Sequence, residues 1–291
     1  MSTAHPTAER GGLAGLPVPR LSFDEFMAFG RQALIRADVP VVITLPRGTQ
    51  GLGREGVAER LGNMMVTLFT EPSNKQNSQR WTTTEIRLGE FFTDRYQTDP
   101  GTWNRIVSNI RDSPADVNAI LGFDAEELFD YRRSLNAANL WISHKGVFTQ
   151  SHFDELENFN IALEGRKRFV LSPPGSWEYY PRSLVRGFGD KSQAFDFDDV
   201  SPQRFPRLVS KLAQRRELIL EPGQMLYLPL GWWHQAESLA EMNINMNFWL
   251  RDLKILRRPY VLGVALYTAA YRKLKGVYNY QPAQAASGDA T

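Results

Sequence analysis

The sequence predicts a mainly β fold in which one barrel is flanked by helices at both ends. From residue 140 to residue 250 the chain consists of short segments rich in β-branched and aromatic residues. Gly and Pro separate these segments at intervals typical of a barrel or a sandwich. On either side of this region, apolar residues recur with the spacing of amphipathic helices. A chain of 291 residues is long enough to bury a substantial core.

The N-terminal part is predicted to be an arm followed by mostly helical segments. Residues 1–20 are rich in Gly, Pro and Ala, which favours a flexible arm. The stretch "LSFDEFMAFGRQAL" has helical spacing with Ser22 or Asp24 as N-cap, "VPVVITLP" is typical of a short buried strand, and "GREGVAERLG" of a helix. The polar "EPSNKQNSQRWTTTE" is expected to be an exposed loop. Two further helices are predicted over residues 88–96 and 102–110.

The second half of the chain is predicted to supply the barrel. The strand-like segments are LWIS, GVFTQSH, FNIALEG, RFVLSP, ELILEPG, MLYLP, WWHQAES and INMNFWL. An irregular insertion over residues 174–214 interrupts them. A helical segment is expected over residues 253–275, and a flexible tail rich in Ala, Gly and Ser over residues 276–291. One barrel domain is therefore expected over residues 21–252.

Composition and charge argue against several classes of function. A net charge of +2 gives no electrostatic reason to expect nucleic acid or an anionic membrane as partner. A chain without Cys has no disulfide, no thiolate zinc site and no Cys nucleophile. The N-terminus lacks the apolar core of a secretion signal, and the longest apolar run, "VLGVALYTAAY", is too short to span a bilayer. We therefore expect a soluble, cytoplasmic protein.

The candidate site begins in the stretch "SHFDELENFNIALEGRKRFVLSPP". His152 and Asp154 stand two residues apart on a strand-like segment, so their side chains point to the same face. The pair alone is equally typical of a His beside a surface Asp. A second stretch, "EPGQMLYLPLGWWHQAES", supplies His234 on a strand after a Pro-Gly turn. Two His and one carboxylate on one face leave coordination positions open, as in non-haem Fe(II) oxygenases. His144 is expected to be structural or to contact a metal ligand without binding the metal itself.

Together the two stretches resemble the two halves of the cupin motif. Their spacings are Gly146-x5-His152-x-Asp154-x10-Gly165 and Gly223-x5-Pro229-x-Gly231-x2-His234. In cupins the glycines turn the chain at the corners of the barrel and the histidines face its lumen. The resemblance therefore implies a double-stranded β-helix, the jelly-roll barrel, with His152, Asp154 and His234 on one metal ion.

The chain further resembles the JmjC-type 2-oxoglutarate oxygenases, and among them the asparaginyl hydroxylases. The similarity follows residues 149–174 and the stretches "FDFDD", "RFP", "PGQMLYLPLGWWH", "ES" and "NMNFW". It implies Fe(II) as cofactor and 2-oxoglutarate and O₂ as cosubstrates. It also implies that His152, Asp154 and His234 are the catalytic iron ligands.

The same resemblance implies four contacts to the cosubstrate. Lys167 would pair with the distal carboxylate of 2-oxoglutarate, and the Thr149 hydroxyl would bond the same group. Asn158 and Asn247 would line the cosubstrate and metal pocket. Strand alternation places Lys167 opposite its two neighbouring arginines, and a buried lysine needs an anion to neutralise it. The alternative is a solvated Arg-Lys-Arg turn. The family's tyrosine contact to 2-oxoglutarate has no clear counterpart in "TWNRIVSNI".

The function implied is hydroxylation of an amino-acid side chain, in a peptide or protein or in an amino-acid-derived intermediate, with release of succinate and CO₂. Two alternatives stay open: a natural-product oxygenase with the same mechanism, and a non-oxygenase cupin that binds metal or acts as an isomerase. The insertion over residues 174–214 mixes both charges with aromatic residues, which suits a peptide or small polar substrate. Asp190 and Lys191 stand near the position of the Arg-Gln pair of the asparaginyl hydroxylases.

The C-terminal helix bears on assembly. It carries more apolar residues than one face of a monomer needs to bury, namely Leu256, Tyr260, Val264, Leu266, Tyr267 and Tyr271. In the related hydroxylases a C-terminal helical pair forms the dimer, so the resemblance implies a homodimer. The alternative is that the helix packs only on its own barrel.

Overall fold

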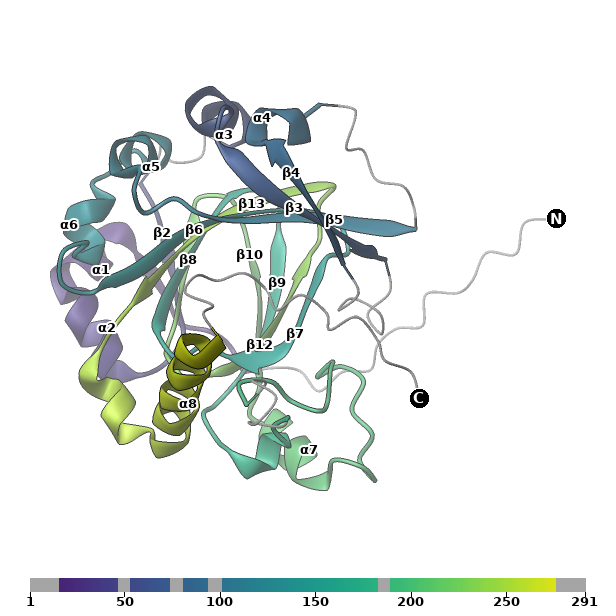
Figure 1. Ribbon diagram of the computed structural model, residues 1–291. Coiled ribbons are helices and arrows are strands. Elements are labelled where there is room, and N and C mark those ends of the chain that lie inside the picture. Colours follow the sequence, from purple (N-terminus) through teal and green to yellow (C-terminus); the bar gives the residue numbers. More distant parts are fainter. Residues whose placement is uncertain (1–15, 47–52, 74–80, 94–100, 183–188, 276–291) are drawn as a thin grey trace.

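The fold is mainly β, with two sheets forming a barrel and helices packed around it, as predicted (Figure 1). The structure is a computed structural model that describes residues 16–46, 53–73, 81–93, 101–182 and 189–275. Most of the expected N-terminal arm and the whole expected tail over residues 276–291 lie outside the described residues. No helix within the described ranges is long and apolar enough to cross a membrane.

The larger sheet has nine strands, and all its neighbours are antiparallel except the first pair. Its order is β1 (Arg20–Ser22), β2 (Val41–Thr44), β11 (Gln224–Leu228), β8 (Glu157–Glu164), β13 (Met242–Leu250), β6 (Leu135–His144), β5 (Thr102–Asn109), β3 (Met65–Pro72) and β4 (Thr82–Arg87). The smaller sheet has four strands, in the order β10 (Arg216–Leu220), β9 (Lys167–Ser172), β12 (Trp233–Ser238) and β7 (Phe148–Phe153). The strand-like segments predicted in the second half are confirmed as β6 to β13.

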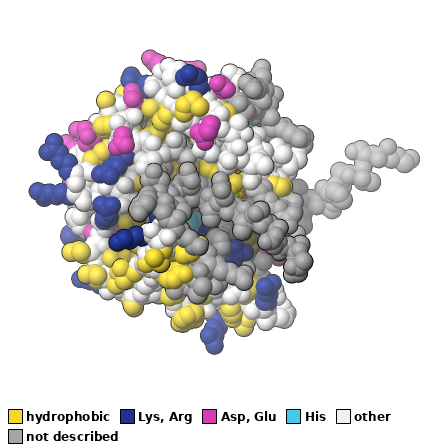
Figure 2. Space-filling model, in the orientation of Figure 1, with side chains coloured by type: hydrophobic (Ala, Val, Ile, Leu, Met, Phe, Trp, Pro, Cys, Tyr) yellow, Lys and Arg dark blue, Asp and Glu magenta, His cyan; other side chains and the backbone are white. Residues whose placement is uncertain are grey.

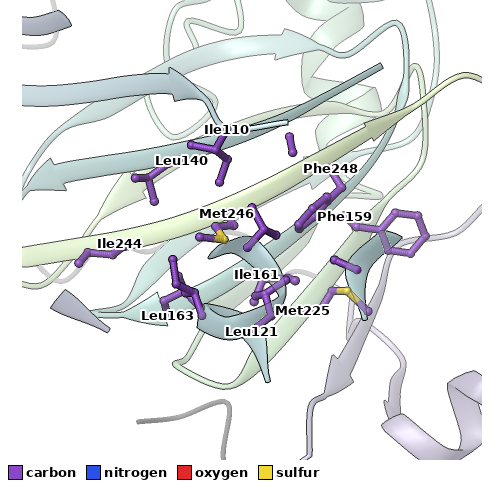
Figure 3. Packing of buried hydrophobic residues seen from close by; sticks show 14 of the residues in the cluster. Ile110, Leu121, Leu140, Phe159, Ile161, Leu163, Met225, Ile244, Met246 and Phe248 are labelled. Carbon is purple, nitrogen blue, oxygen red and sulfur yellow. The ribbon is translucent and has the colours of Figure 1, made fainter. Parts of the chain in front are cut away.

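The two faces of the larger sheet differ in chemistry because side chains alternate along each strand. One face is apolar and packs against the N-terminal helices, with Phe159, Ile161, Ile244, Met246 and Phe248 all 0% exposed (Figure 3). The opposite face looks into the barrel and carries amides, namely Asn139, Asn158, Asn160, Asn243, Asn245 and Asn247. Full burial of each apolar side chain stabilises the fold by about 1.5–3 kcal/mol, so one face of the sheet supplies the core and the other is free for function.

Short helices cover the apolar face of the larger sheet (Figure 1). They are α1 (Phe23–Phe29), α2 (Arg31–Ala37), α3 (Arg54–Leu61), α4 (Leu88–Phe91), α5 (Pro114–Leu121) and α6 (Ala125–Phe129). The first predicted helix is interrupted at Gly30, whose φ of 75° ends α1 and starts α2. Its N-cap is Ser22, because the Ser22 hydroxyl accepts from the Glu25 N–H and the Glu25 carboxylate accepts from the Ser22 N–H.

Residues 102–110 were predicted to be a helix, and this prediction is wrong. They form β5, which is hydrogen-bonded to β3 on one side and β6 on the other. Trp103, Ile106 and Ile110 have helical spacing, but pairing on both edges and the β-branched residues Thr, Ile and Val outweigh it. The predicted polar loop is likewise strand at both ends, in β3 and β4. The helix expected over residues 88–96 ends at Phe91, and residues 94–100 lie outside the described residues.

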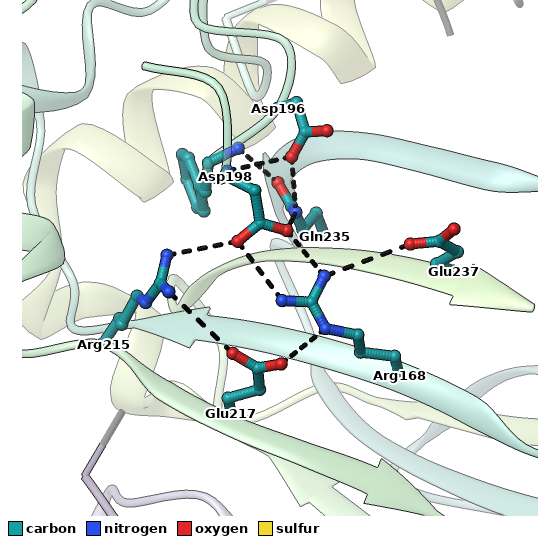
Figure 4. Close-up of polar contacts among 8 residues, drawn as sticks. Arg168, Asp196, Asp198, Arg215, Glu217, Gln235 and Glu237 are labelled. Carbon is teal, nitrogen blue, oxygen red and sulfur yellow. Dashed lines mark hydrogen bonds and ion pairs between the residues drawn. The ribbon is translucent and has the colours of Figure 1, made fainter. Parts of the chain in front are cut away.

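The insertion packs on the outer face of the smaller sheet. It contains η3 (Trp177–Tyr179) and α7 (Pro206–Leu212), whose apolar residues cover Phe153, Val170 and Trp233. Beside them lies an ionic network around Arg168 (Figure 4). The Arg168 guanidinium contacts Asp198 at 2.6 Å and Glu217 at 2.5 Å, and Arg215 contacts Asp198 at 3.2 Å. The network therefore ties the insertion to β9 and β10.

The C-terminal segment consists of η5 (Leu253–Arg257) and α8 (Pro259–Lys275). Lys254 anchors it by ion pairs to the buried Glu157 at 2.7 Å and to Asp38 at 2.9 Å. Val261 and Val264 are buried against the barrel, whereas Leu266 is 63% exposed and Leu274 85%. Figure 2 shows hydrophobic side chains gathered on the surface where α8 lies. The helix therefore has one face on its own barrel and a second apolar face directed outward.

Candidate metal centre

The structure brings His152, Asp154 and His234 together at one point. His152 lies near the end of β7, Asp154 follows that strand, and His234 lies on β12 directly opposite His152 in the ladder. The Nε2 atoms of both histidines are 3.8 Å from carboxylate oxygens of Asp154. One ligand atom from each residue lies within 4.8 Å of the others. The three side chains predicted to share a metal therefore do face one another.

Two turns with left-handed glycines lie at the site, one before the strand of Lys167 and one before the strand of His234. The motif glycines Gly165 and Gly231 have φ of 73° and 78°, a left-handed conformation that side chains disfavour. A Cβ atom on Gly165 would stand 2.2 Å from the Met242 carbonyl oxygen, so only glycine fits the turn before β9. The Gly231 N–H donates to the Asp154 carbonyl at 2.8 Å. This bond joins the two halves of the sequence motif across the site.

A bulge in β7 places Thr149 on the same side as His152. Residues three apart on a regular strand face opposite sides of the sheet. Here Gln150 and Ser151 together stand opposite the single residue Gln235 of β12, because His152 pairs with His234 while Thr149 pairs with Ala236. The extra residue reverses the alternation, so that Thr149 lines the pocket beside the metal centre.

The histidines are held in the form that binds a metal. The Nδ1 atom of His152 lies 2.8 Å from the Gln150 carbonyl oxygen, and that of His234 lies 3.0 Å from the Trp232 carbonyl oxygen. A proton on each Nδ1 satisfies these carbonyls and leaves the Nε2 lone pairs directed at the centre. Burial lowers the pKa of His152, and burial together with the His152 ring lowers the pKa of His234 to about 4. Both rings are therefore neutral near pH 7.

A chain of amides orients the carboxylate. The Asn158 side-chain N–H donates to Asp154 Oδ2 at 2.8 Å, and the Asn247 side-chain N–H donates to the Asn158 amide oxygen at 3.4 Å. The Asn247 oxygen accepts from the Trp141 indole at 2.9 Å and from Asn139 at 3.2 Å. Asn158 and Asn247 thus lie next to the metal centre, and Asn158 contacts a candidate ligand directly.

A pocket beside the centre holds the predicted cosubstrate residues Lys167 and Thr149. It is lined by Arg105, Trp141, Ile142, Ser143, Val147, Thr149, Lys167 and Ser238. The Lys167 ammonium lies 5.6 Å from the centroid of the Trp141 ring and 5.8 Å from that of Phe169. Within the described ranges, no carboxylate lies within 4.0 Å of it. Burial, aided by the positive charge of Arg105, lowers the pKa of Lys167 to about 8. An ammonium without an anion in such a place suits a negatively charged ligand.

The donors present fit a divalent transition metal with open positions. Two neutral imidazoles and one carboxylate are the donor set of non-haem iron(II) sites, and carbonyl and amide groups position all three of them. No thiolate is available in this chain, which carries no cysteine. The pocket and the donor set together fit iron(II) with a dianionic oxo acid.

The other sequence predictions about the site have mixed outcomes. His144 is 6% exposed and stacks on Phe91 with ring centroids 5.1 Å apart, so it lies outside the ligand set as expected. Arg168 points away from Lys167 into the outer network, as strand alternation predicted. Arg105, Ser143 and Ser238 were missed. Arg105 had been assigned to a helix, and single serines on strands carry no sequence signal.

Asp190 and Lys191 lie beside the strand that carries His152. The Asp190 carbonyl accepts from the Phe153 N–H at 3.0 Å, and Lys191 forms a β-bridge with His152. Next to them, burial and the charge of Asp190 raise the pKa of Glu155 to about 7. Thr268 and Arg272 of α8 also interact with Glu155. Acidic and basic groups therefore lie close to the metal centre on the side of the insertion and α8.

Comparison with known proteins agrees with this geometry. A family model described as a cupin-like domain matches residues 34–254. The chain is 30% identical over 128 residues to lysine-specific demethylase JMJ31 of Arabidopsis thaliana, covering 44% of this chain and 23% of that protein. It is 33% identical over 122 residues to human HSPB1-associated protein 1, covering 40% and 24%. It is 34% identical over 114 residues to zebrafish (Danio rerio) tRNA wybutosine-synthesizing protein 5, covering 38% and 32%. The matched regions thus span only about a quarter to a third of these relatives.

Proposed function

The chain belongs to the cupin-like domain family, and from that premise we propose that it is an iron(II)- and 2-oxoglutarate-dependent oxygenase. One observation carries the proposal. The His152, Asp154 and His234 cluster lies beside a pocket in which Lys167 has no anionic partner among the described residues. A metal-binding module or an isomerase would also need the three ligands, but neither function would explain the buried ammonium of Lys167.

Different residues would bind the metal and the cosubstrate. Bound iron(II) supplies the redox chemistry that couples decarboxylation of 2-oxoglutarate by O₂ to oxidation of a substrate, giving succinate and CO₂. His152, Asp154 and His234 would hold the iron, and Asn158 fixes the carboxylate of Asp154 through its hydrogen bond of 2.8 Å. Lys167 and Thr149 would bind the distal carboxylate of 2-oxoglutarate in the pocket that both line.

We infer that the reaction is hydroxylation of an amino-acid side chain, in a peptide or protein or in an amino-acid-derived intermediate. The mixed charges of Glu155, Asp190 and Lys191 near the metal centre favour a polar or zwitterionic substrate over a lipid. One similar protein is named as a lysine-specific demethylase and another as a tRNA wybutosine-synthesizing protein. Hydroxylation of an N-methyl group and oxidation of a modified nucleoside side chain are therefore alternative outcomes of the substrate search.

The reaction class is tested under anaerobic conditions. Purified protein with Fe(II) and 2-oxoglutarate should give a metal-to-ligand charge-transfer absorbance, and His234→Ala should abolish it. Metal binding without this absorbance would favour a non-oxygenase cupin. Incubation with ¹⁸O₂ and a cell lysate, followed by separate mass spectrometry of peptides, RNA and metabolites, then identifies the substrate. Label found only in a metabolite unrelated to amino acids would overturn the substrate class and leave the reaction class intact.

We also propose that the protein is a homodimer that associates through the outward face of its C-terminal segment. Leu253, Leu256, Leu266 and Leu274 are between 62% and 85% exposed there, while Val261 and Val264 of the same segment pack on the barrel. A second copy would bury these leucines. Light scattering should give twice the monomer mass, and Leu266→Glu should shift it toward the monomer. A monomer at micromolar concentration in both proteins would contradict the proposal.

A further inference from the structure

We propose that Arg105 is a second cationic residue for the distal carboxylate of the cosubstrate, facing Lys167 across the same pocket. The proposal rests on the proposed function. It concerns a residue of β5 in the larger sheet, whereas His152 and His234 come from β7 and β12 of the smaller sheet. Lys167 likewise comes from β9 of the smaller sheet. Each of the two sheets would thus contribute one cationic side chain to the pocket.

The strand register directs Arg105 into the pocket. Arg105 pairs with Ser143 of β6 on one side and with Phe69 of β3 on the other, and paired residues share a face. Ser143 lines the pocket together with Arg105 and Lys167. The neighbouring residue Ile106 points the opposite way and is 0% exposed in the apolar core. The guanidinium is therefore on the barrel side of the sheet.

The Arg105 side chain is held between two aromatic rings, and its Nε makes no hydrogen bond in the described part of the chain. Its guanidinium carbon lies 5.8 Å from the ring centroid of Phe69 and 5.7 Å from that of Trp81. Its Nε atom is 3.5 Å from Glu71 Oε1, yet neither Glu71 oxygen nor Nε makes a hydrogen bond in the described part of the chain. A guanidinium positioned in advance beside the pocket offers a planar fork of N–H groups, which can bind a carboxylate bidentately.

The charges around the pocket also favour an anion. Arg105 and Lys167 contribute two positive charges close enough for one to affect the other, and the side chain of Glu71, 0% exposed, contributes one negative charge. One positive charge remains, which a single carboxylate neutralises. Glu71 therefore acts as a positioning residue for Arg105. A purely structural Arg105–Glu71 pair would instead be expected to close its own hydrogen bonds, since a buried pair is stable only with good geometry.

The test distinguishes the contribution of the distal carboxylate to binding from that of the rest of the cosubstrate. Mn(II)-loaded protein is titrated calorimetrically with 2-oxoglutarate and with pyruvate, which keeps the 2-oxo acid group and lacks the distal carboxylate. Arg105→Met should weaken 2-oxoglutarate binding about 10- to 100-fold, the effect of losing a charge-assisted hydrogen-bond pair, and should leave pyruvate binding unchanged. Arg105→Lys keeps the charge without the fork and should weaken 2-oxoglutarate binding by roughly three- to tenfold. The matched control is Arg87→Met, an exposed arginine on β4 of the same sheet.

Two results with Arg105→Met would contradict the proposal. Affinity for 2-oxoglutarate within twofold of wild type in Arg105→Met overturns the proposal, and so does an equal weakening of both ligands, which marks a structural role. If Arg105→Met does not fold, Arg105→Lys decides by the same comparison of ligands. If the wild-type protein binds Mn(II) but not 2-oxoglutarate, the proposed function is wrong, and the proposed role of Arg105 is wrong with it.

Discussion

Replacing Lys167 with methionine is expected to make the ligand-free protein more stable and to remove its stabilisation by 2-oxoglutarate. The fall in the pKa of Lys167 from 10.5 to about 8 means that the folded protein disfavours the charged ammonium by about 3 kcal/mol. The variant loses the cation–π contacts with the Trp141 and Phe169 rings, which reduces its gain in stability by about 1 kcal/mol. Methionine fills similar space without the charge. A net gain of about 2 kcal/mol follows, or roughly 4 °C in Tm for a chain of this size.

The pH dependence of that gain identifies its cause. Below pH 8 the lysine is charged in both the folded and the unfolded protein, so the folded state carries the whole penalty. Between pH 8 and 10.5 the folded protein has lost the proton while the unfolded chain keeps it, and wild-type stability rises toward that of the variant. Thermal unfolding of both proteins at pH 7 and at higher pH measures this. Saturating 2-oxoglutarate with Mn(II) should stabilise wild type only. A variant less stable than wild type at pH 7 without ligand would refute the reasoning.

Three further predictions concern the same site and its support. 2-Oxoglutarate needs the protonated form of Lys167, so the dissociation constant of 2-oxoglutarate should be constant below pH 8 and rise by up to about tenfold per pH unit above pH 8. The dissociation constant of pyruvate, measured by the same calorimetry, should not rise. Asn158→Ala should weaken metal binding about tenfold or more in a competition assay with a chelator dye, because the carboxylate of Asp154 loses its orienting bond; unchanged affinity would remove Asn158 from the centre. Asp198→Ala should lower the free energy of unfolding by about 3 kcal/mol, because two partly buried arginines lose their shared partner, and a denaturant series that shows no change would contradict this.

The candidate metal ligands could be proposed from the sequence because two short motifs, each at a strand, resemble the two halves of the cupin motif. His152 and Asp154 are two residues apart at the end of a strand, and glycines at fixed spacing reveal the turns that bring His234 beside them. The strands of the second half were equally readable, since each buries an alternating apolar face of its own. The role of Lys167 was implied by the family resemblance, and the same alternation agreed with it. In these places short-range pattern and tertiary structure agree.

The parts that sequence reasoning missed depend on pairing between distant segments. β5 has helical apolar spacing and becomes a strand only because β3 and β6 bind both of its edges. The error concealed Arg105, whose direction is decided by that pairing. The bulge opposite Gln235 likewise leaves no mark in the sequence, although it decides that Thr149 faces the pocket. Long-range register is therefore the information that a single sequence lacks.

The alternation along β9 limits how this chain can change length. Lys167 faces the ligand pocket and Arg168, one residue on, faces the outer ionic network. An insertion in the turn at Gly165 that shifts β9 by one residue would place Arg166 in the barrel and Lys167 among Asp198 and Glu217. A deletion with the same shift would place Arg168 in the barrel and Phe169 among these carboxylates. Point substitutions at either position alter one surface, but a single-residue shift damages both together. Across natural variants, the loop between β8 and β9 should therefore be constant in length even where its residues differ.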